Sequence, residues 1–144
     1  MSPHSRLEML MQALGLYAAD LLQGKPVGLR VGDDQWLDLR FDTETGRLTV
    51  LALVGSSLDH SRAYLMAGLL QANATLTAAS TLRLGMEHGS GRVALGGFFD
   101  LARVDADIVQ TGLHELAQAC RETRKQLARL QLLDAETSVH PDWM

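Results

Sequence analysis

The chain has 144 residues, a length typical of one compact domain that folds without a disulfide or a structural metal. Hydrophobic residues make up 47% and charged residues 21%, which excludes a disordered or collagen-like chain. With 13 basic against 17 acidic residues the formal net charge is −4, and no dense basic stripe is present, so a general nucleic-acid binder is not expected. The single cysteine, Cys120, excludes an intrachain disulfide and a multi-cysteine zinc site.

The first predicted element is a helix over residues 5–14, with Ser5 and Glu8 as a capping box and Gly15 as its stop. At about 100° per residue the helix has two apolar faces. One carries Leu7, Leu10, Met11 and Leu14, and the other carries Met9, Ala13 and Tyr17. The helix therefore has more apolar surface than one core contact requires. The sequence has no run of about 18 apolar residues, so no membrane span is predicted. The charges of Arg6 and Glu8 cancel before the apolar stretch 9–19, whereas a signal peptide begins with a net positive charge, so no signal peptide is predicted.

Three strands are predicted next, over residues 27–31, 37–41 and 47–54. The first two alternate apolar and polar side chains with the period of a strand, and the third is apolar on nearly both sides. Short turns at 32–34 and 43–46 join them. Strands joined by such short turns predict an antiparallel meander.

A second helix is predicted after Asp59, which can cap it. No charge interrupts its residues 63–70, so this helix is expected to be buried on all sides or to lie in an oligomer interface. The small residues Ala63, Ala67 and Gly68 allow close approach of another helix. We expect a homodimer interface at Ala63, Leu65, Met66, Leu69 and Leu70.

The remaining elements are two strands, over 81–87 and 92–99, and a long helix over 105–130. A turn at 88–91 joins the strands, and Gly96 with Gly97 is expected to loosen the second strand. The apolar stripe of the last helix carries Val109, Leu113, Leu116, Cys120, Leu127 and Leu130. The order αβββαββα predicts an α+β domain, a twisted antiparallel sheet flanked by helices, over residues 1–133, followed by a flexible tail over 134–144.

No motif for catalysis or for a cofactor is found. The sequence has no phosphate-binding loop, and His114-Glu115 lacks the second histidine of a zinc-protease helix. The other four histidines are scattered over ends and turns. Cys120 lies in the apolar stripe, where an inert core thiol is favoured over a reactive one, although Arg121 and Arg124 would lower its pKa. We therefore expect no enzyme activity, no metal and no cofactor.

Several hydrophobic patterns add to this order of elements. They are Leu7-x-x-Leu10-Met11-x-Ala13-Leu14-Gly15-Leu16, Leu37-x-Leu39-x-Phe41-Asp42, Leu69-Leu70-x-Ala72-Asn73, Gly91-Arg92-Val93-x-Leu95 and Leu113-x-x-Leu116. Together with the αβββαββα order, which covers about residues 6–130, they resemble the class I type III secretion chaperones of the Tir-chaperone-like family. The specificity of the resemblance lies in the combined order and not in one motif.

The resemblance implies a homodimeric chaperone of the bacterial cytoplasm that serves virulence-associated secretion. Such a chaperone keeps the N-terminal segment of a secreted effector soluble and competent for secretion, by strand addition at a sheet edge and by grooves that accept short helices. It implies the secretion ATPase as a further partner, and neither nucleic-acid binding nor membrane insertion. The effector-binding residues are expected to be Leu7, Leu10, Met11, Leu14, Leu37, Leu39, Phe41, Leu82 and Leu84, with Asp38 and Arg40 at the rim.

Two other functions stay open at this point. A non-catalytic adaptor or regulator of the same fold would bind a folded partner, and a small enzyme would need polar residues converging on one pocket. For the first helix, the alternative interpretation is that both apolar faces are buried, one under the sheet and one under the last helix. In that case Met11 and its neighbours belong to the core.

Overall fold

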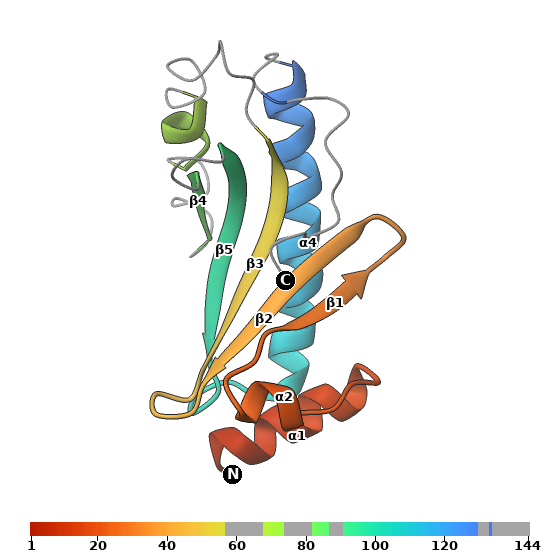
Figure 1. Cartoon of the computed structure of the whole chain (residues 1–144), viewed down its shortest axis with the longest axis vertical. Helices are drawn as coiled ribbons and strands as arrows, with labels where there is room; N and C mark the ends of the chain where they lie inside the picture. Colours follow the sequence, from red (N-terminus) through yellow and green to blue (C-terminus); the bar gives the residue numbers. More distant parts are fainter. Residues whose placement is uncertain (57–67, 74–81, 87–90, 130–132, 134–144) are drawn as a thin grey trace.

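A five-stranded antiparallel sheet, in the order β1-β2-β3-β5-β4, lies against one long helix (Figure 1). The computed structural model describes residues 1–56, 68–73, 82–86, 91–129 and 133. Its elements are α1 (Pro3–Ala13), α2 (Ala19–Leu22), β1 (Val27–Val31), β2 (Gln35–Asp42), β3 (Arg47–Ser56), β4 (Arg83–Met86), β5 (Arg92–Asp100) and α4 (Ala106–Arg129). Residues 68–73 are helical and lie between β3 and β4 in the chain. The predicted α+β class and element order are confirmed, with the short helix α2 in addition.

The meander β1-β2-β3 forms as predicted. β1 pairs with β2 from Val27 opposite Leu39, and β2 pairs with β3 from Leu37 opposite Ala52. Gly32 and Gly46 in the two turns have φ of 69° and 73°, a backbone conformation that favours glycine. β3 runs to Ser56, two residues beyond the predicted end at Val54.

β5 is an inner strand that pairs with β3 on one side and with β4 on the other. Gly96 lies opposite Leu51 of β3 and opposite Arg83 of β4, so the ladder continues through the glycines. The expected loosening of this strand is wrong, because neighbours on both sides hold the backbone at Gly96. The irregularity lies in β3 instead, where the register shifts between Leu53 and Gly55.

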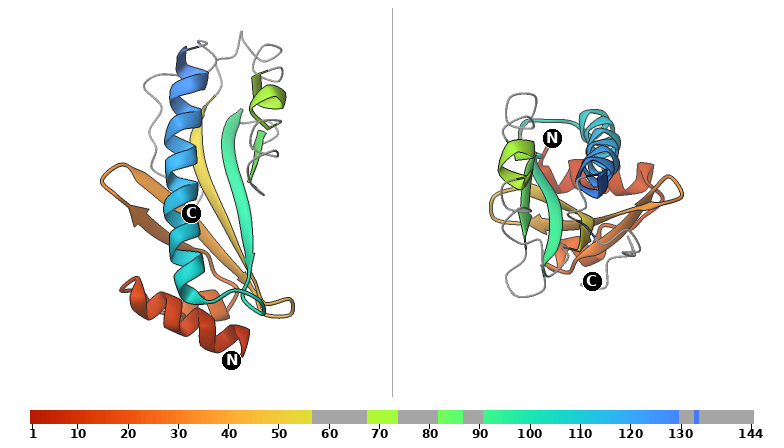
Figure 2. Two further views of the ribbon diagram at one scale, coloured as in Figure 1. Left: turned by 180° about the vertical axis from the view of Figure 1, so that it is seen from behind. Right: turned by 90° about the horizontal axis from the view of Figure 1, so that it is seen from above.

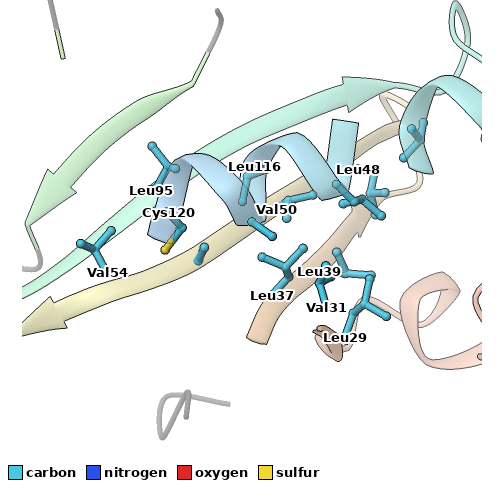
Figure 3. Packing of buried hydrophobic residues seen from close by; sticks show 14 of the residues in the cluster. Leu29, Val31, Leu37, Leu39, Leu48, Val50, Val54, Leu95, Leu116 and Cys120 are labelled. Carbon is cyan, nitrogen blue, oxygen red and sulfur yellow. The ribbon is translucent and has the colours of Figure 1, made fainter. Parts of the chain in front are cut away.

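The core fills the space between the sheet and α4 (Figure 3). Of the predicted stripe of α4, Val109, Leu113, Leu116, Cys120 and Leu127 are buried, and Leu130 lies outside the described residues. From the sheet, the side chains that face α4 are mainly leucine and valine, such as Leu48, Val50 and Leu95. Most of this face of the sheet is therefore covered by the fold.

α1 lies across the start of α4 at one end of the molecule (Figure 2). The helix begins at Pro3 and not at Ser5, and its cap is Ser2, whose Oγ accepts the Ser5 backbone N–H at 3.1 Å. The predicted capping box is wrong because Pro3 starts the helix: proline has no N–H to leave unpaired in the first turn. The predicted stop is confirmed, since Gly15 has φ of 73° directly after the C-cap Leu14.

Several sequence predictions fall outside the described residues. They are the Asp59 cap, the interface residues Ala63, Leu65 and Met66, the turn residues 88–90 and the tail 134–144. Within the described ranges, no helix is both long and apolar enough to cross a membrane.

Candidate functional site

The residues expected to line a groove on α1 and β2 lie in the core of the single chain. Leu7, Leu10, Met11, Leu37 and Leu39 have no exposed surface, and Phe41 is 6% exposed. The expectation of an open groove at these side chains is wrong, because the side chains of α1 and β2 pack into the same cluster as α4. Leu14 is half-buried against that cluster. A segment bound at the surface would not reach the six core side chains without displacing a helix.

The apolar surface left over on the N-terminal segment lies on the other face of α1 and, at Tyr17, in the segment after the helix ends. Met9 is half exposed, Ala13 is exposed, and Tyr17 is 88% exposed. The sequence therefore separated Met9 and Ala13 from the buried face correctly, but the prediction of Tyr17 on the same helix face is wrong because α1 ends at Ala13.

The helical residues 68–73 lie beside β4. Asn73 donates from Nδ2 to the Leu84 carbonyl at 2.9 Å and accepts the Leu84 N–H through Oδ1 at 2.6 Å. The amide group thus completes the backbone hydrogen bonds of Leu84 on the side of β4 away from β5. Of the expected interface residues, Leu69 is buried and Leu70 is 71% exposed.

The sheet face opposite α4 carries a hollow over β3, β5 and β4, which we call the outer hollow. It has a volume of about 660 Å³. Its residues include Arg47, Leu51, Arg83, Gly85, Ala94, Gly96 and Phe98. The hollow exists because Gly85, Ala94 and Gly96 present little or no side chain between larger neighbours. A Cβ at Gly96 would lie 2.9 Å from Leu51 Cδ2, whereas one at Gly85 would meet nothing within 4 Å.

The outer hollow is apolar with positive charge at its margin. The Arg47 guanidinium lies 4.7 Å from the centroid of the half-exposed Phe98 ring, a cation–π contact. Arg83 is a second arginine among the lining residues, which include no acidic side chain. Leu84, one of the residues expected to bind an effector, also lines the hollow. The Gly96-Gly97 pair was the signal for this site in the sequence, and the alternation of β5 would have placed Gly96 and Phe98 on one face.

Two ionisable side chains, Cys120 and Asp38, are buried in the interior. Burial raises the pKa of the Cys120 thiol to about 11, against the opposing effect of Arg124 and Arg121, so this thiol stays protonated at neutral pH, as its place in the apolar stripe predicted. Burial also raises the pKa of the Asp38 carboxyl, although Arg40 lies 3.2 Å away and opposes the shift. His114 is exposed on α4. Among the described residues no cluster of three histidine, cysteine or acidic side chains could hold a metal ion.

Only the comparison with solved structures finds proteins similar to this chain. No protein-family model matches the sequence, and no curated protein matches it. Among solved structures, the chain is similar to one in the HopA1–SchA chaperone–effector complex, with a TM-score of 0.63 and 19% identity over 85% of this chain and 92% of that chain. It is also similar to one in the complex of the Yersinia pestis type III secretion chaperone SycH with a fragment of YscM2, with a TM-score of 0.61 and 15% identity over 85% and 99%.

A further similar structure is that of YbjN, a putative transcription regulator from E. coli. The TM-score is 0.64, with 14% identity over 91% of this chain and 95% of that chain. The same backbone arrangement is thus present in a protein described as a regulator. Identities below 20% with near-complete coverage establish a shared architecture and not a shared activity. The chain has the fold of the class I type III secretion chaperones.

Proposed function

We propose that this protein is a type III secretion chaperone of the bacterial cytoplasm, which binds the N-terminal segment of a secreted effector. It keeps the segment soluble and unfolded until delivery, acts as a homodimer, passes the complex to the secretion ATPase, and catalyses no reaction itself. The observation that carries the proposal is the similarity over 85% of the chain to chains found in chaperone complexes, one of them with an effector.

The surface of the protein supports this proposal. The outer hollow offers an apolar depression of about 660 Å³ on a sheet face that no described helix covers, large enough for several side chains of a bound segment. Its arginines favour a segment in which apolar and acidic side chains alternate. Leu14 and Leu82, both half-buried at the edge of the core, remain candidates for contact with the effector.

Identification of the bound protein tests the proposal. The tagged protein is purified from the cell that produces it, and the co-purifying chain is identified and mapped by limited proteolysis. We expect a secreted protein whose first hundred or so residues are protected from protease only in the complex. Recovery of a folded partner that is equally protease-resistant alone would contradict the proposal.

The outer hollow is tested with a blocking variant. Gly85→Trp adds a large side chain at the hollow, where a Cβ at Gly85 meets nothing within 4 Å. We expect at least a tenfold loss of affinity for the mapped segment with an unchanged circular dichroism spectrum. Gln12→Trp, at an exposed position of α1, is the matched control and should bind as the unaltered protein does. Equal binding by both variants would place the effector elsewhere.

The similarity to YbjN favours one second candidate, a regulator that binds a folded partner. The two functions differ in what the partner needs. An effector segment precipitates or is degraded when the chaperone is absent, whereas a regulator's folded partner stays soluble. Comparison of the partner's solubility with and without this protein therefore separates them.

A further inference from the structure

The last described residue of the chain, Leu133, lies against β3. It is 4% exposed, and a Cβ at Gly55 would lie 3.3 Å from its Cδ1 atom. It comes four residues after the end of α4 at Arg129. The contact therefore fixes the point from which residues 134–144, which we call the tail, continue. That point is Gly55 of β3, and β3 is one of the strands that form the outer hollow.

The tail is long enough to reach the outer hollow from this point. The lining residues of β3 run from Leu51 to Arg47, about 13 to 26 Å from Gly55 at the rise of a strand. Trp143 follows Leu133 by ten residues, which span up to about 33 Å when extended. The indole ring of Trp143 can therefore reach either end of the hollow.

The tail complements the outer hollow in charge. Its charged residues are Asp134, Glu136 and Asp142, and it contains neither lysine nor arginine. The lining of the hollow has the opposite charge, with Arg47 and Arg83 and no acidic side chain. Attraction between opposite charges favours the contact, and the attachment of the tail at β3 raises its effective concentration at the hollow.

Trp143 also suits the apolar part of the hollow. The lining includes Leu51 and the 49% exposed ring of Phe98, whose centroid lies 4.7 Å from the Arg47 guanidinium. Tryptophan is the strongest aromatic partner of a guanidinium group, and it also packs well against another aromatic ring. With a volume of about 660 Å³, the hollow has room for an indole ring. Covering an apolar surface of this kind protects a protein from aggregation.

We propose that the tail folds back on its own chain and covers the outer hollow, with Trp143 in the depression and acidic side chains beside the arginines. The contact is autoinhibitory, because a partner segment binds only after the tail has left. The observed affinity for that segment is then reduced by the fraction of molecules in which the hollow is open. The inference rests on the proposed function only in taking the hollow as the effector site, since the contact itself needs no partner.

Fluorine NMR on the full chain tests the contact. With both tryptophans replaced by 5-fluorotryptophan, Trp36 and Trp143 give two resonances, and Trp143→Phe assigns them. The reference is a synthetic peptide of residues 134–144 that carries the same label. We expect the Trp143 resonance of the protein to differ from that of the peptide. A resonance at the position of the peptide would overturn the inference.

Two variants at the hollow assign the contact. Gly85→Leu adds a side chain where a Cβ meets nothing within 4 Å, and Arg47→Glu reverses an exposed charge at the margin. Both should move the Trp143 resonance to the position of the peptide while the circular dichroism spectrum stays unchanged. Lys25→Glu makes the same charge change at an exposed position outside the hollow and should leave the resonance in place. A resonance that neither hollow variant moves would place the tail elsewhere and overturn the inference.

Binding of the mapped effector segment, measured by fluorescence anisotropy, separates the tail contact from the chaperone function. Trp143→Ala in the full chain should bind the segment at least threefold more tightly than the unaltered protein does. Ser138→Ala, also in the tail, is the control and should not change the affinity. If a secreted protein is captured but Trp143→Ala binds its segment no more tightly, the autoinhibitory contact fails while the chaperone function stands.

The remaining outcomes are also decisive. If the Trp143 resonance responds to both hollow variants but no secreted protein is ever captured, the tail contact stands and the chaperone function fails. A Trp143 resonance that moves toward that of the peptide on dilution of the protein would show that the tail binds a second copy, which overturns the proposed contact within one chain.

Discussion

Arg124 joins α4 to the irregular end of β3. Its guanidinium donates to the carbonyls of Val54 at 2.8 Å and Leu53 at 3.0 Å, and to Gln35 Oε1 at 2.7 Å. The carbonyls belong to the stretch where the register of β3 shifts, so they lack regular partners in the ladder. One side chain thus satisfies three buried acceptors from two strands.

We expect Arg124→Met to lower the free energy of unfolding by about 3 kcal/mol, because methionine fills the space but removes the guanidinium donors and leaves the Leu53 carbonyl only the Cys120 thiol at 3.4 Å. Urea denaturation monitored by circular dichroism measures the change. Arg129→Met, at an exposed position of the same helix, is the control and should stay within about 0.5 kcal/mol of the unaltered protein. Equal losses in both variants would show that the contacts of Arg124 contribute little.

The buried carboxyl of Asp38 predicts how the stability of the protein depends on pH. Its carboxyl is buried, its Oδ1 has no hydrogen-bond partner within the described part of the chain, and burial raises its pKa. Between the unfolded and the raised folded pKa the native state binds more protons, so stability falls as pH rises through this window. Asp38→Asn should therefore raise the urea midpoint at pH 7 and leave it unchanged at a pH below both values. A lower midpoint at pH 7 would show that the ion pair with Arg40 outweighs burial.

At the scale of elements, the contact of α4 with β5 depends on Gly112. Alanine favours a helix by about 1 kcal/mol over glycine, yet its Cβ would lie 2.5 Å from Phe99 Cε1. We expect Gly112→Ala to destabilise the protein, since the aromatic ring must move. In a Phe99→Leu background the same change should become neutral or stabilising, and a double-mutant cycle by thermal denaturation measures this coupling. Equal effects in both backgrounds would contradict the assigned contact.

The elements themselves were largely predictable from local pattern. The alternation of apolar and polar residues fixes β1 and β2, and the stripe from Val109 to Leu127 fixes α4, because burial of one face imposes a period. The start of α1 was missed because Ser2 and Ser5 are both good caps, and only the position of Pro3 decides between them. α2 was missed because four residues are too few to show a period.

The candidate site was much less predictable. Periodicity indicates which side chains share a face, but the tertiary partner decides which face is covered. Met11 and Met9 lie on different faces of α1, and only the packing of α4 shows that Met11 is buried while Met9 is exposed. The outer hollow forms because Gly85 of β4 and Gly96 of β5, which have no side chains, lie close together in the sheet. The Gly96-Gly97 pair marks one strand of the hollow in the sequence, but no local pattern shows that Gly85 lies beside it.

At the scale of the whole molecule, the two faces of the sheet differ in use and in charge. The face toward α4 is covered by the core except beside Phe99, where Asp107 and Glu115 are the charged residues of a groove between β5 and α4. The opposite face carries the outer hollow, with arginines at its margin. A net charge of −4 therefore conceals two surfaces of opposite preference.

The expected homodimer gives the last prediction. Leu69 is buried within the chain, so a charge there would unfold the protein, whereas Leu70 next to it is 71% exposed in helical residues 68–73. If Leu70 lies in the dimer interface, Leu70→Glu buries an unpaired charge there, at a cost of roughly 3 kcal/mol or about 100-fold in the dimer dissociation constant. Size-exclusion chromatography with light scattering should show a folded monomer. Gln126→Glu, exposed on α4, should remain dimeric. A soluble, unchanged dimer from Leu70→Glu would place the interface on another surface, and a monomer from the unaltered protein would contradict the homodimer itself.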